Sequence, residues 1–511
     1  MINRPLASRV RRPSLHSLSS LSVVSLLPLL LSACAVGPAY VRPAIDTPAA
    51  YKELDGWKLA EPNDAALRAA WWQAYADPLL DSLMSRVSSA NQTLAQAEAR
   101  YRQARALVQS ARAGYFPTVG ANLSSTRSSA RSRSGQSSLV QADGSLTASS
   151  GGSSTSSTSS TSSTSNTLGL DANWEIDLWG RVQRTVEAQQ AGAQASAGDL
   201  EATRLSAQAQ LAQSYFSLRS IDTQQQLLER TLADYLRSVQ LTQNQYDAGI
   251  VAKSNLILAQ TQLKTTQAQA LDLGVQRAQL EHAIALLIGR APSDFSIAPA
   301  SLTATLPVIP VSVPSDLLER RPDIAAAERR MEAANAQIGI AKTAYFPKLS
   351  LSANAGAQSS SMANLLSLPN RFWSFGPALA ATLFDGGARR AQVEQAGAAY
   401  DGTVAAYRQT VLTGFQEVED NLAALRILEA ESVVQQEALQ LARRSVELTN
   451  NQYKAGIVTY LNVIQVQATA LNNERAALDI LNRRLTASVL LIKALGGGWT
   501  TAALAPPATL K

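Results

Sequence analysis

The chain has 511 residues, of which 5 % are aromatic and 16 % charged, and it carries one cysteine and a formal net charge of +6 at pH 7. A single cysteine excludes an intrachain disulfide. Four arginines lie within the first 33 residues, which contain no acid, so the remaining chain has a net charge of only +2 and gives little reason to expect nucleic-acid binding. The scarcity of aromatic residues suits long, closely packed helices better than a thick globular core.

Residues 1–33 have the pattern of a secretory signal peptide, with arginines ahead of a short apolar stretch at 21–31 and small residues before Cys34. The apolar stretch is too short to remain as a membrane span. Because the sole cysteine stands at the expected cleavage point, the segment resembles a bacterial lipoprotein signal, in which Cys34 becomes the lipid-bearing first residue. The sorting rule of such lipoproteins implies the outer membrane, since Ala35 and not Asp follows. A plain signal peptide with an incidental cysteine is the alternative.

Residues 34–76 contain prolines and predict an extended segment. Asp77 and Pro78 then have the residue types of an N-cap and a first helical position, so a helix is expected to run from there to about Gly114. Tyr115–Pro117 ends this helix, and Tyr345–Pro347 repeats the same motif later in the chain.

After each Tyr-Phe-Pro motif the hydrophobic period changes to two. The alternating segments are 119–124, 168–178, 349–356 and 373–383. Apolar residues facing one side over about ten positions are typical of an outer-membrane barrel strand, although a soluble half-buried sheet shows the same alternation. Four strands cannot close a barrel and open edges are not tolerated in lipid, so other copies of the chain are expected to complete it. The Ser/Thr/Gly-rich tract around Ser124–Asn166 predicts a flexible extracellular loop.

Two proline-free runs, 180–247 and 387–454, predict very long helices, and shorter helices are expected to return at 252–289 and 458–495. The turns between them, at 244–251 and 451–458, agree at seven of eight positions and are separated by 207 residues. Gly249 and Gly456 suit the left-handed position that ends a helix, and the following isoleucines are expected to pack back on the last helical turn.

This repetition predicts an internally duplicated α+β protein. The expected boundaries are a signal peptide at 1–33, an N-terminal segment at 34–76, a first repeat at 77–289, a linker at 290–320, a second repeat at 321–495 and a tail at 496–511.

Motifs along nearly the whole mature chain resemble those of the TolC-like outer membrane factors, specifically the NodT-type lipoprotein channels that serve resistance-nodulation-division efflux pumps. Besides both Tyr-Phe-Pro motifs and both helical turns, the matching segments are Cys34–Pro43, Trp71–Pro78, Glu175–Arg181, Leu318–Asp323, Leu383–Gly387 and Lys493–Trp499.

The resemblance implies a homotrimer that acts as a passive exit duct. Twelve strands would cross the outer membrane, and twelve helices would continue as a periplasmic tunnel with an equatorial belt. A periplasmic adaptor and an inner-membrane transporter would be the partners whose docking opens the duct. No cofactor is implied apart from the lipid on Cys34.

The resemblance also implies which residues close the periplasmic aperture. Tyr453, Leu461 and Gln465 would lie on the closing helices, with Leu461 as an apolar constriction. Gln465 stands where the family has an acidic ring, which puts a cation-binding ring in doubt. Asp247 and Lys454 occupy the same place in the two turns, so we name as the predicted latch an ion pair between these two residues on neighbouring hairpins.

Catalysis is not expected from this sequence. It has only two histidines, His16 in the signal segment and His282 on a helical run, and it shows no metal-ligand spacing, phosphate loop or nucleophile–base arrangement. Two other hypotheses stay open at this point: a type I secretion duct, and a coiled-coil lipoprotein that tethers the membrane without forming a channel. The tether does not account for the four alternating segments.

Overall fold

The computed structural model describes residues 36–45, 47–53, 70–131, 160–309, 311 and 314–499. Cys34 and the predicted signal peptide lie outside these residues, as do 132–159 in the Ser/Thr-rich tract and the tail beyond Trp499. The chain divides into two compact units. The first comprises Met1–Pro38, Gln109–Val186 and Ala336–Gln395, and the second comprises Ala39–Val108, Glu187–Asn335 and Ala396–Lys511.

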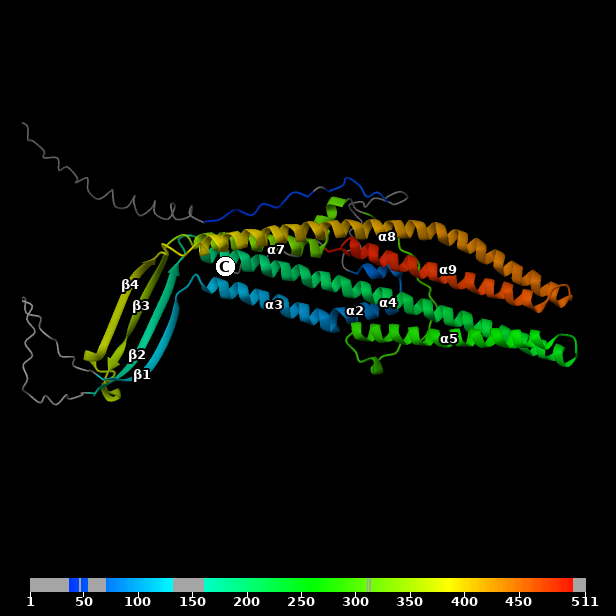
Figure 1. Ribbon diagram of the computed structural model, residues 1–511, viewed down its shortest axis with the longest axis horizontal. Coiled ribbons are helices and arrows are strands. Elements are labelled where there is room, and N and C mark those ends of the chain that lie inside the picture. The colour runs from blue at the N-terminus through cyan, green and yellow to red at the C-terminus, as the bar shows by residue number, and fades with distance from the viewer. Residues whose placement is uncertain are drawn as a thin grey trace, which may run out of the picture. The chain divides into compact units, whose positions relative to one another are not determined.

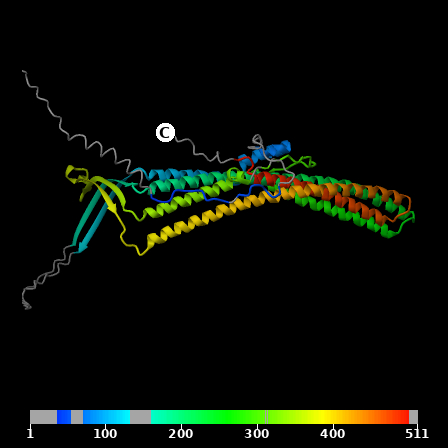
Figure 2. The same ribbon diagram turned by 90° about the horizontal axis from the view of Figure 1, so that it is seen from above.

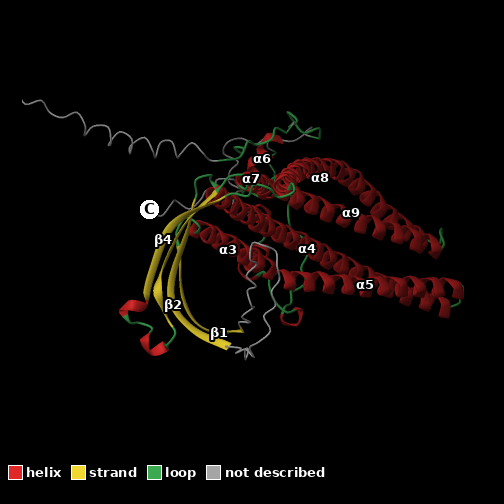
Figure 3. Ribbon diagram, turned by 60° about the vertical axis from the view of Figure 1, so that its left-hand side comes forward, coloured by secondary structure: helices red, strands yellow, loops and turns green. Residues whose placement is uncertain are grey.

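The first unit contains one antiparallel sheet in which the four strands follow in chain order (Figure 1). The strands are β1 (Thr118–Arg131), β2 (Ser160–Ile176), β3 (Lys348–Ser359) and β4 (Arg371–Ala380). Figure 3 shows the strands bending together along their length. Apolar side chains on this sheet are open to the surroundings: Trp373 is 80 % exposed and Val119 is 72 % exposed. The sheet therefore buries little of its apolar surface within one chain.

The prediction of a loop across Ser124–Asn166 is wrong at both ends. β1 continues to Arg131 and β2 begins at Ser160, and these two residues are partners in the ladder. Strand pairing uses backbone groups, so a serine- and threonine-rich sequence can extend a ladder without an apolar face. The hydroxyl groups of Ser128 and Ser163 add a cross-strand hydrogen bond of 2.8 Å.

The helices are mostly those expected from the sequence. They are α2 (Pro78–Ala90), α3 (Gln92–Ala113), α4 (Arg181–Asp247), α5 (Lys253–Leu287), α6 (Leu317–Arg320), α7 (Pro322–Thr343), α8 (Ala388–Lys454) and α9 (Tyr460–Ala494). Short 3-10 turns occupy Trp71–Tyr75, Pro292–Asp294, Pro314–Asp316, Met362–Asn364 and Leu368–Asn370. Among the described residues, no helix is both long enough and apolar enough to cross a membrane.

The first predicted helix, from Asp77 to about Gly114, is interrupted at Asn91. Its start is as expected, because the Asp77 carboxylate accepts hydrogen bonds from the backbone of Leu79 and Leu80. Asn91 is extended at ψ 123°, and its side-chain oxygen accepts from the backbone of Leu94, so it caps α3. Its amide also donates to the Leu287 carbonyl at 2.7 Å, which satisfies an end carbonyl of α5. The break therefore joins two helix ends.

The core of the second unit lies where α2 meets the long helices. Trp71 and Phe216 are fully buried, and Tyr75 packs between them with its hydroxyl 2.7 Å from Ser488 Oγ. Aromatic residues are few in the chain, and several of them lie together in this cluster.

Within this unit the long helices form two hairpins, which we call the first hairpin (α4 and α5) and the second hairpin (α8 and α9). Figures 1 and 3 show the helices in the order α8, α9, α4, α5, and Figure 2 shows the same pairs from above. Leu228 of α4, Leu273 of α5 and Leu471 of α9 form one buried cluster. The second hairpin is therefore packed on the first through α9, which contacts both α4 and α5.

Candidate functional site at the helical turns

Both turns between the long helices have the same backbone geometry. Gly249 and Gly456 adopt φ values of 69° and 73°. One residue further on, the Ile250 amide donates to the Gln245 carbonyl at 2.8 Å, and the Ile457 amide donates to Gln452 at 2.9 Å. These bonds satisfy end carbonyls of α4 and α8, as expected for glycine-terminated helices.

The two isoleucines depart from expectation. Ile250 is 71 % exposed and Ile457 is 72 % exposed, so neither is buried against the preceding helical turn. Each hairpin therefore ends in a large apolar side chain that its own chain leaves open.

Just above the turns, the two hairpins are joined by tyrosines. The Tyr453 hydroxyl donates to Gln245 Oε1 at 2.9 Å, and the Tyr460 hydroxyl lies 2.6 Å from Ser238 Oγ. The two rings are also in contact, with centroids 5.5 Å apart. Burial raises the pKa of both tyrosines above the ordinary value, so both stay protonated at neutral pH. These contacts hold the second hairpin to the first near its end.

Two of these partners have no signal in the sequence. Tyr460 and Ser238 are separated by 222 residues, and no periodicity relates them. The family resemblance implies Tyr453 as a residue of the closing helices, whereas the sequence identifies its partner Gln245 only as a residue of the repeated turn.

Leu461 and Gln465 are one helical turn apart on α9 and both are exposed; Leu461 is 46 % exposed. Between them, Val463 is buried, and it packs with Tyr460 and Ala259 of the first hairpin. The face of α9 with Leu461 and Gln465 is thus turned away from the intrachain packing.

Asp247 and Lys454 do not pair within the described part of one chain. Instead, the Asp247 carboxylate accepts a hydrogen bond of 2.9 Å from Gln243. In the same part of the chain, no group of three or more His, Cys, Asp and Glu side chains is placed to hold a metal ion.

The chain combines two 67-residue helices that have equivalent turns with an antiparallel sheet that has an exposed apolar surface. This combination is the architecture of a channel of the bacterial outer membrane. Comparison with known proteins makes this specific. The family model of the outer membrane efflux proteins matches residues 83–290 and 313–497, and the chain belongs to this family.

Relatives and solved structures agree along nearly the full length. The chain is 32 % identical over 485 residues to the pyoverdine export outer membrane protein OpmQ of Pseudomonas aeruginosa, covering 94 % of this chain and 98 % of the relative. It is 32 % identical over 486 residues to the probable efflux pump outer membrane protein TtgC of Pseudomonas putida, covering 94 % and 96 %. The structure of the outer-membrane channel OprN matches with a TM-score of 0.80 at 28 % identity, covering 91 % of this chain and 100 % of that one.

The protein is therefore an exit duct for efflux across the outer membrane, and it is not an enzyme. Membership of this family accounts for the absence of a catalytic or cofactor-binding motif in the sequence. It also sets aside the tether hypothesis, which had no explanation for the strands.

Proposed function

We propose that three copies of the chain form one duct, with twelve strands closing a barrel in the outer membrane. The open edges of the sheet carry this proposal. Among the described strands, β1 pairs only with β2, and β4 pairs only with β3. Unpaired backbone groups in hydrocarbon cost several kcal/mol each, so a membrane-embedded sheet must find partners for both edges. Identical neighbours provide them, and exposed Trp373 and Phe375 suit contact with lipid.

Exposed apolar residues on the long helices support the same ring. Four apolar residues of α8 recur every seven positions and are 48–72 % exposed: Ile427, Val434, Leu441 and Leu448. We call them the α8 stripe. A seven-residue apolar repeat is the pattern of a coiled-coil seam. On α5, Leu271 and Val275 are 78 % and 57 % exposed. In the proposed ring the α8 stripe of one copy meets these residues of the next copy, since contacts between two different surfaces can close into a ring.

The helical part would extend into the periplasm and end in the aperture. In a ring of three copies, the free face of α9 with Leu461 and Gln465 turns to the axis, so three leucines narrow the passage. Tyr453 then holds the closing helices against the first hairpin. Opening requires the Tyr453–Gln245 and Tyr460–Ser238 contacts to separate.

The exposed turns are the proposed docking surface for a periplasmic adaptor, which joins the duct to an inner-membrane transporter of the resistance-nodulation-division class. Ile250 and Ile457 provide apolar contacts at the turns, and Gly249 and Gly456 allow the backbone to be approached closely, since no other atom lies within 4 Å of a side chain built there. Asp247 and Lys454 at the same level form the predicted latch between hairpins of neighbouring copies. A type I secretion duct has the same parts, but the relatives named above are efflux proteins.

A lipid on Cys34 would anchor each copy. The backbone amide of Val36 donates to the Trp179 carbonyl at 3.2 Å, just beyond the end of β2. Only one residue separates Val36 from Cys34, so this contact supports an anchor beside the strand ends. Residues 132–159, at the opposite end of β1 and β2, would then form the extracellular loop.

We also propose that the chain arose by duplication, with repeats at 77–289 and 321–495, a linker at 290–320, an N-terminal segment at 34–76 and a tail at 496–511. The equal lengths of α4 and α8 (67 residues) and of α5 and α9 (35 residues) support this division.

The proposal is tested on the full-length lipidated protein in detergent. Native mass spectrometry should give a trimer, electron microscopy a hollow three-fold particle, and a planar bilayer a measurable conductance. Leu441→Asp in the α8 stripe should reduce the trimer fraction, whereas Gln440→Asp, an exposed neighbour outside the stripe, should not. A monomeric rod without conductance would contradict the proposal.

A further inference from the structure

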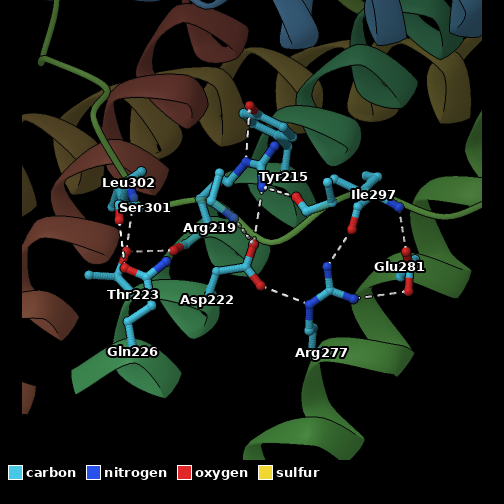
Figure 4. A network of polar contacts seen from close by, with 12 residues as sticks. Tyr215, Arg219, Asp222, Thr223, Gln226, Arg277, Glu281, Ile297, Ser301 and Leu302 are labelled. Atoms are coloured by element: carbon cyan, nitrogen blue, oxygen red, sulfur yellow. Dashed lines mark hydrogen bonds and ion pairs between the residues drawn. The ribbon is translucent and has the colours of Figure 1, made fainter. Parts of the chain in front are cut away.

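A short extended segment, Ile297–Leu302, lies across both helices of the first hairpin, and we call it the strap. Figure 4 shows its contacts with α4. The Ala298 carbonyl accepts from Arg219 Nη1 at 2.9 Å, the Ala300 amide donates to Asp222 Oδ2 at 3.1 Å, and the Leu302 amide donates to Thr223 Oγ1 at 2.9 Å. Three alternate residues of the strap, at 298, 300 and 302, are thus bound by side chains of one helix.

The other helix of the hairpin holds the start of the strap. On α5, Arg277 donates to the Ile297 carbonyl and Glu281 accepts from the Ile297 amide. Arg277 and Glu281 also pair with each other at 3.1 Å. Both backbone groups of Ile297 are therefore bound by α5, and the strap spans the two helices.

Asp222 is the centre of the arrangement. Its side chain is completely buried, and it forms ion pairs with Arg219 of α4 at 3.1 Å and with Arg277 of α5 at 2.8 Å. We call Arg219, Asp222, Arg277 and Glu281 the clasp. Its two positive and two negative charges balance, and each side chain has a partner of opposite charge. A buried charge without such a partner would destabilise the fold.

Tyr215 connects the clasp to the start of α2. Its hydroxyl donates to the Asp77 carboxylate at 2.6 Å and accepts from Arg219 Nε at 3.2 Å. Asp77 is the N-cap of α2, so the position of the first hairpin is tied to the aromatic core of the unit.

The second hairpin has no such arrangement at the positions 207 residues further on, which are Arg426, Glu429, Arg484 and Ser488. Arg484 lies 3.5 Å from Glu429, but the Glu429 side chain is 72 % exposed. Arg426 pairs with Glu53 of the N-terminal segment. Ser488, in place of Glu281, contacts Tyr75. Within the described residues, none of these four side chains bonds to the backbone of an extended segment; on α8 it is Glu419 that accepts from the Lys52 and Glu53 amides.

We propose that Asp222 is a positioning residue for the aperture: the clasp fixes the first hairpin to the strap and so holds Gln245 where Tyr453 can bind it. This inference rests on the proposed duct. A helix is a stiff lever, and 23 residues separate Asp222 from Gln245, which corresponds to about 35 Å of helix. A tilt of about 5° at the clasp moves the far end by about 3 Å, enough to break a hydrogen bond.

The experiment uses full-length protein in planar bilayers. Asp222→Asn leaves Arg219 and Arg277 without their shared anion, and the leak conductance is expected to rise several-fold. Glu429→Gln, the matched change in the second hairpin, should leave it at the level of the unmodified protein. A second readout is the yield of cross-linking between Gln245→Cys and Tyr453→Cys by a short bifunctional thiol reagent, since the only native cysteine is Cys34. The yield should fall in the Asp222→Asn background and not in the Glu429→Gln background.

The outcomes separate the two proposals. If the unmodified protein forms no channel, the proposed duct fails. If it conducts, and Asp222→Asn changes neither the leak nor the cross-linking yield, the positioning role is overturned. Should Asp222→Asn not assemble, Thr223→Val removes the acceptor for the Leu302 amide and the donor to the Arg219 carbonyl, and it leaves the ion pairs of the clasp in place. A rise in leak would then support the role, and an unchanged leak and yield would overturn it.

Discussion

The two hairpins of this protein have the same helix lengths and nearly the same turn, yet their charges are used differently. In the first hairpin, Asp222 is buried between two arginines and a strap crosses both helices. In the second, the matching carboxylate of Glu429 is 72 % exposed, although its partner Arg484 is 21 % exposed. The two hairpins thus have helices of equal length and equivalent turns, but only the first is bound to the strap through a buried carboxylate. A few side chains near the middle of each hairpin make this difference.

The largest expected difference is in stability. Asp222→Ala should lower the free energy of unfolding by about 3–5 kcal/mol, because it leaves the buried Arg219 without an anion and Arg277 with Glu281 alone. Glu429→Ala should change it by about 0–1 kcal/mol, because an exposed pair contributes little. Thermal unfolding followed by far-ultraviolet circular dichroism gives both values. Equal losses in the two variants would contradict the contrast between the hairpins.

The turns should behave alike. Gly249→Ala and Gly456→Ala each place a side chain on a left-handed residue, at a cost of about 1–2 kcal/mol. Both sites are sterically open, so the cost is conformational and should be the same in each hairpin. The two melting temperatures are the measurement. Clearly different values would show that one turn is supported by contacts that the other lacks.

A smaller effect is expected where the hairpins meet. Tyr453→Phe removes one hydrogen bond, worth about 1 kcal/mol, and should raise the leak conductance modestly. Burial raises the pKa of Tyr453 above the ordinary tyrosine value of 10.0, so the contribution of its hydrogen bond is complete below pH 10 and is lost as the pH rises through the raised pKa. The Tyr453-dependent part of the leak should therefore increase only above pH 10, and Tyr453→Phe should lack that part. An identical alkaline rise in the variant would assign it to another group.

The predicted latch should have the smallest effect, since an exposed pair contributes about 0–1 kcal/mol. Asp247→Lys and Lys454→Asp should each raise the leak slightly, and the double variant should restore it. If both single variants conduct as the unmodified protein does, the latch idea fails.

The regular elements could be predicted because their signals are local. Asp77 and Pro78 start a helix and Gly249 ends one, and both are found as expected. The break at Asn91 was missed because its cause is distant: its amide binds the end of α5, 196 residues away. Arg219 and Asp222 lie three residues apart, as do many surface pairs, and only the fold buries them. The exposed Ile250 and Ile457 were misplaced because a single chain was assumed to provide their contacts.

One further consequence follows from the unequal strands. β3 begins to pair with β2 only at Asn166, so residues 160–165 of β2 pair with β1 alone. Beyond this level each copy carries a narrow two-stranded ribbon rich in serine and threonine, and such ribbons are marginally stable on their own. In a closed ring of three copies, the outer rim would consist of three tall polar ribbons alternating with three short hairpins. In the proposed ring these ribbons would be the least stable part of the rim, and serine and threonine hydroxyl groups would dominate their described part.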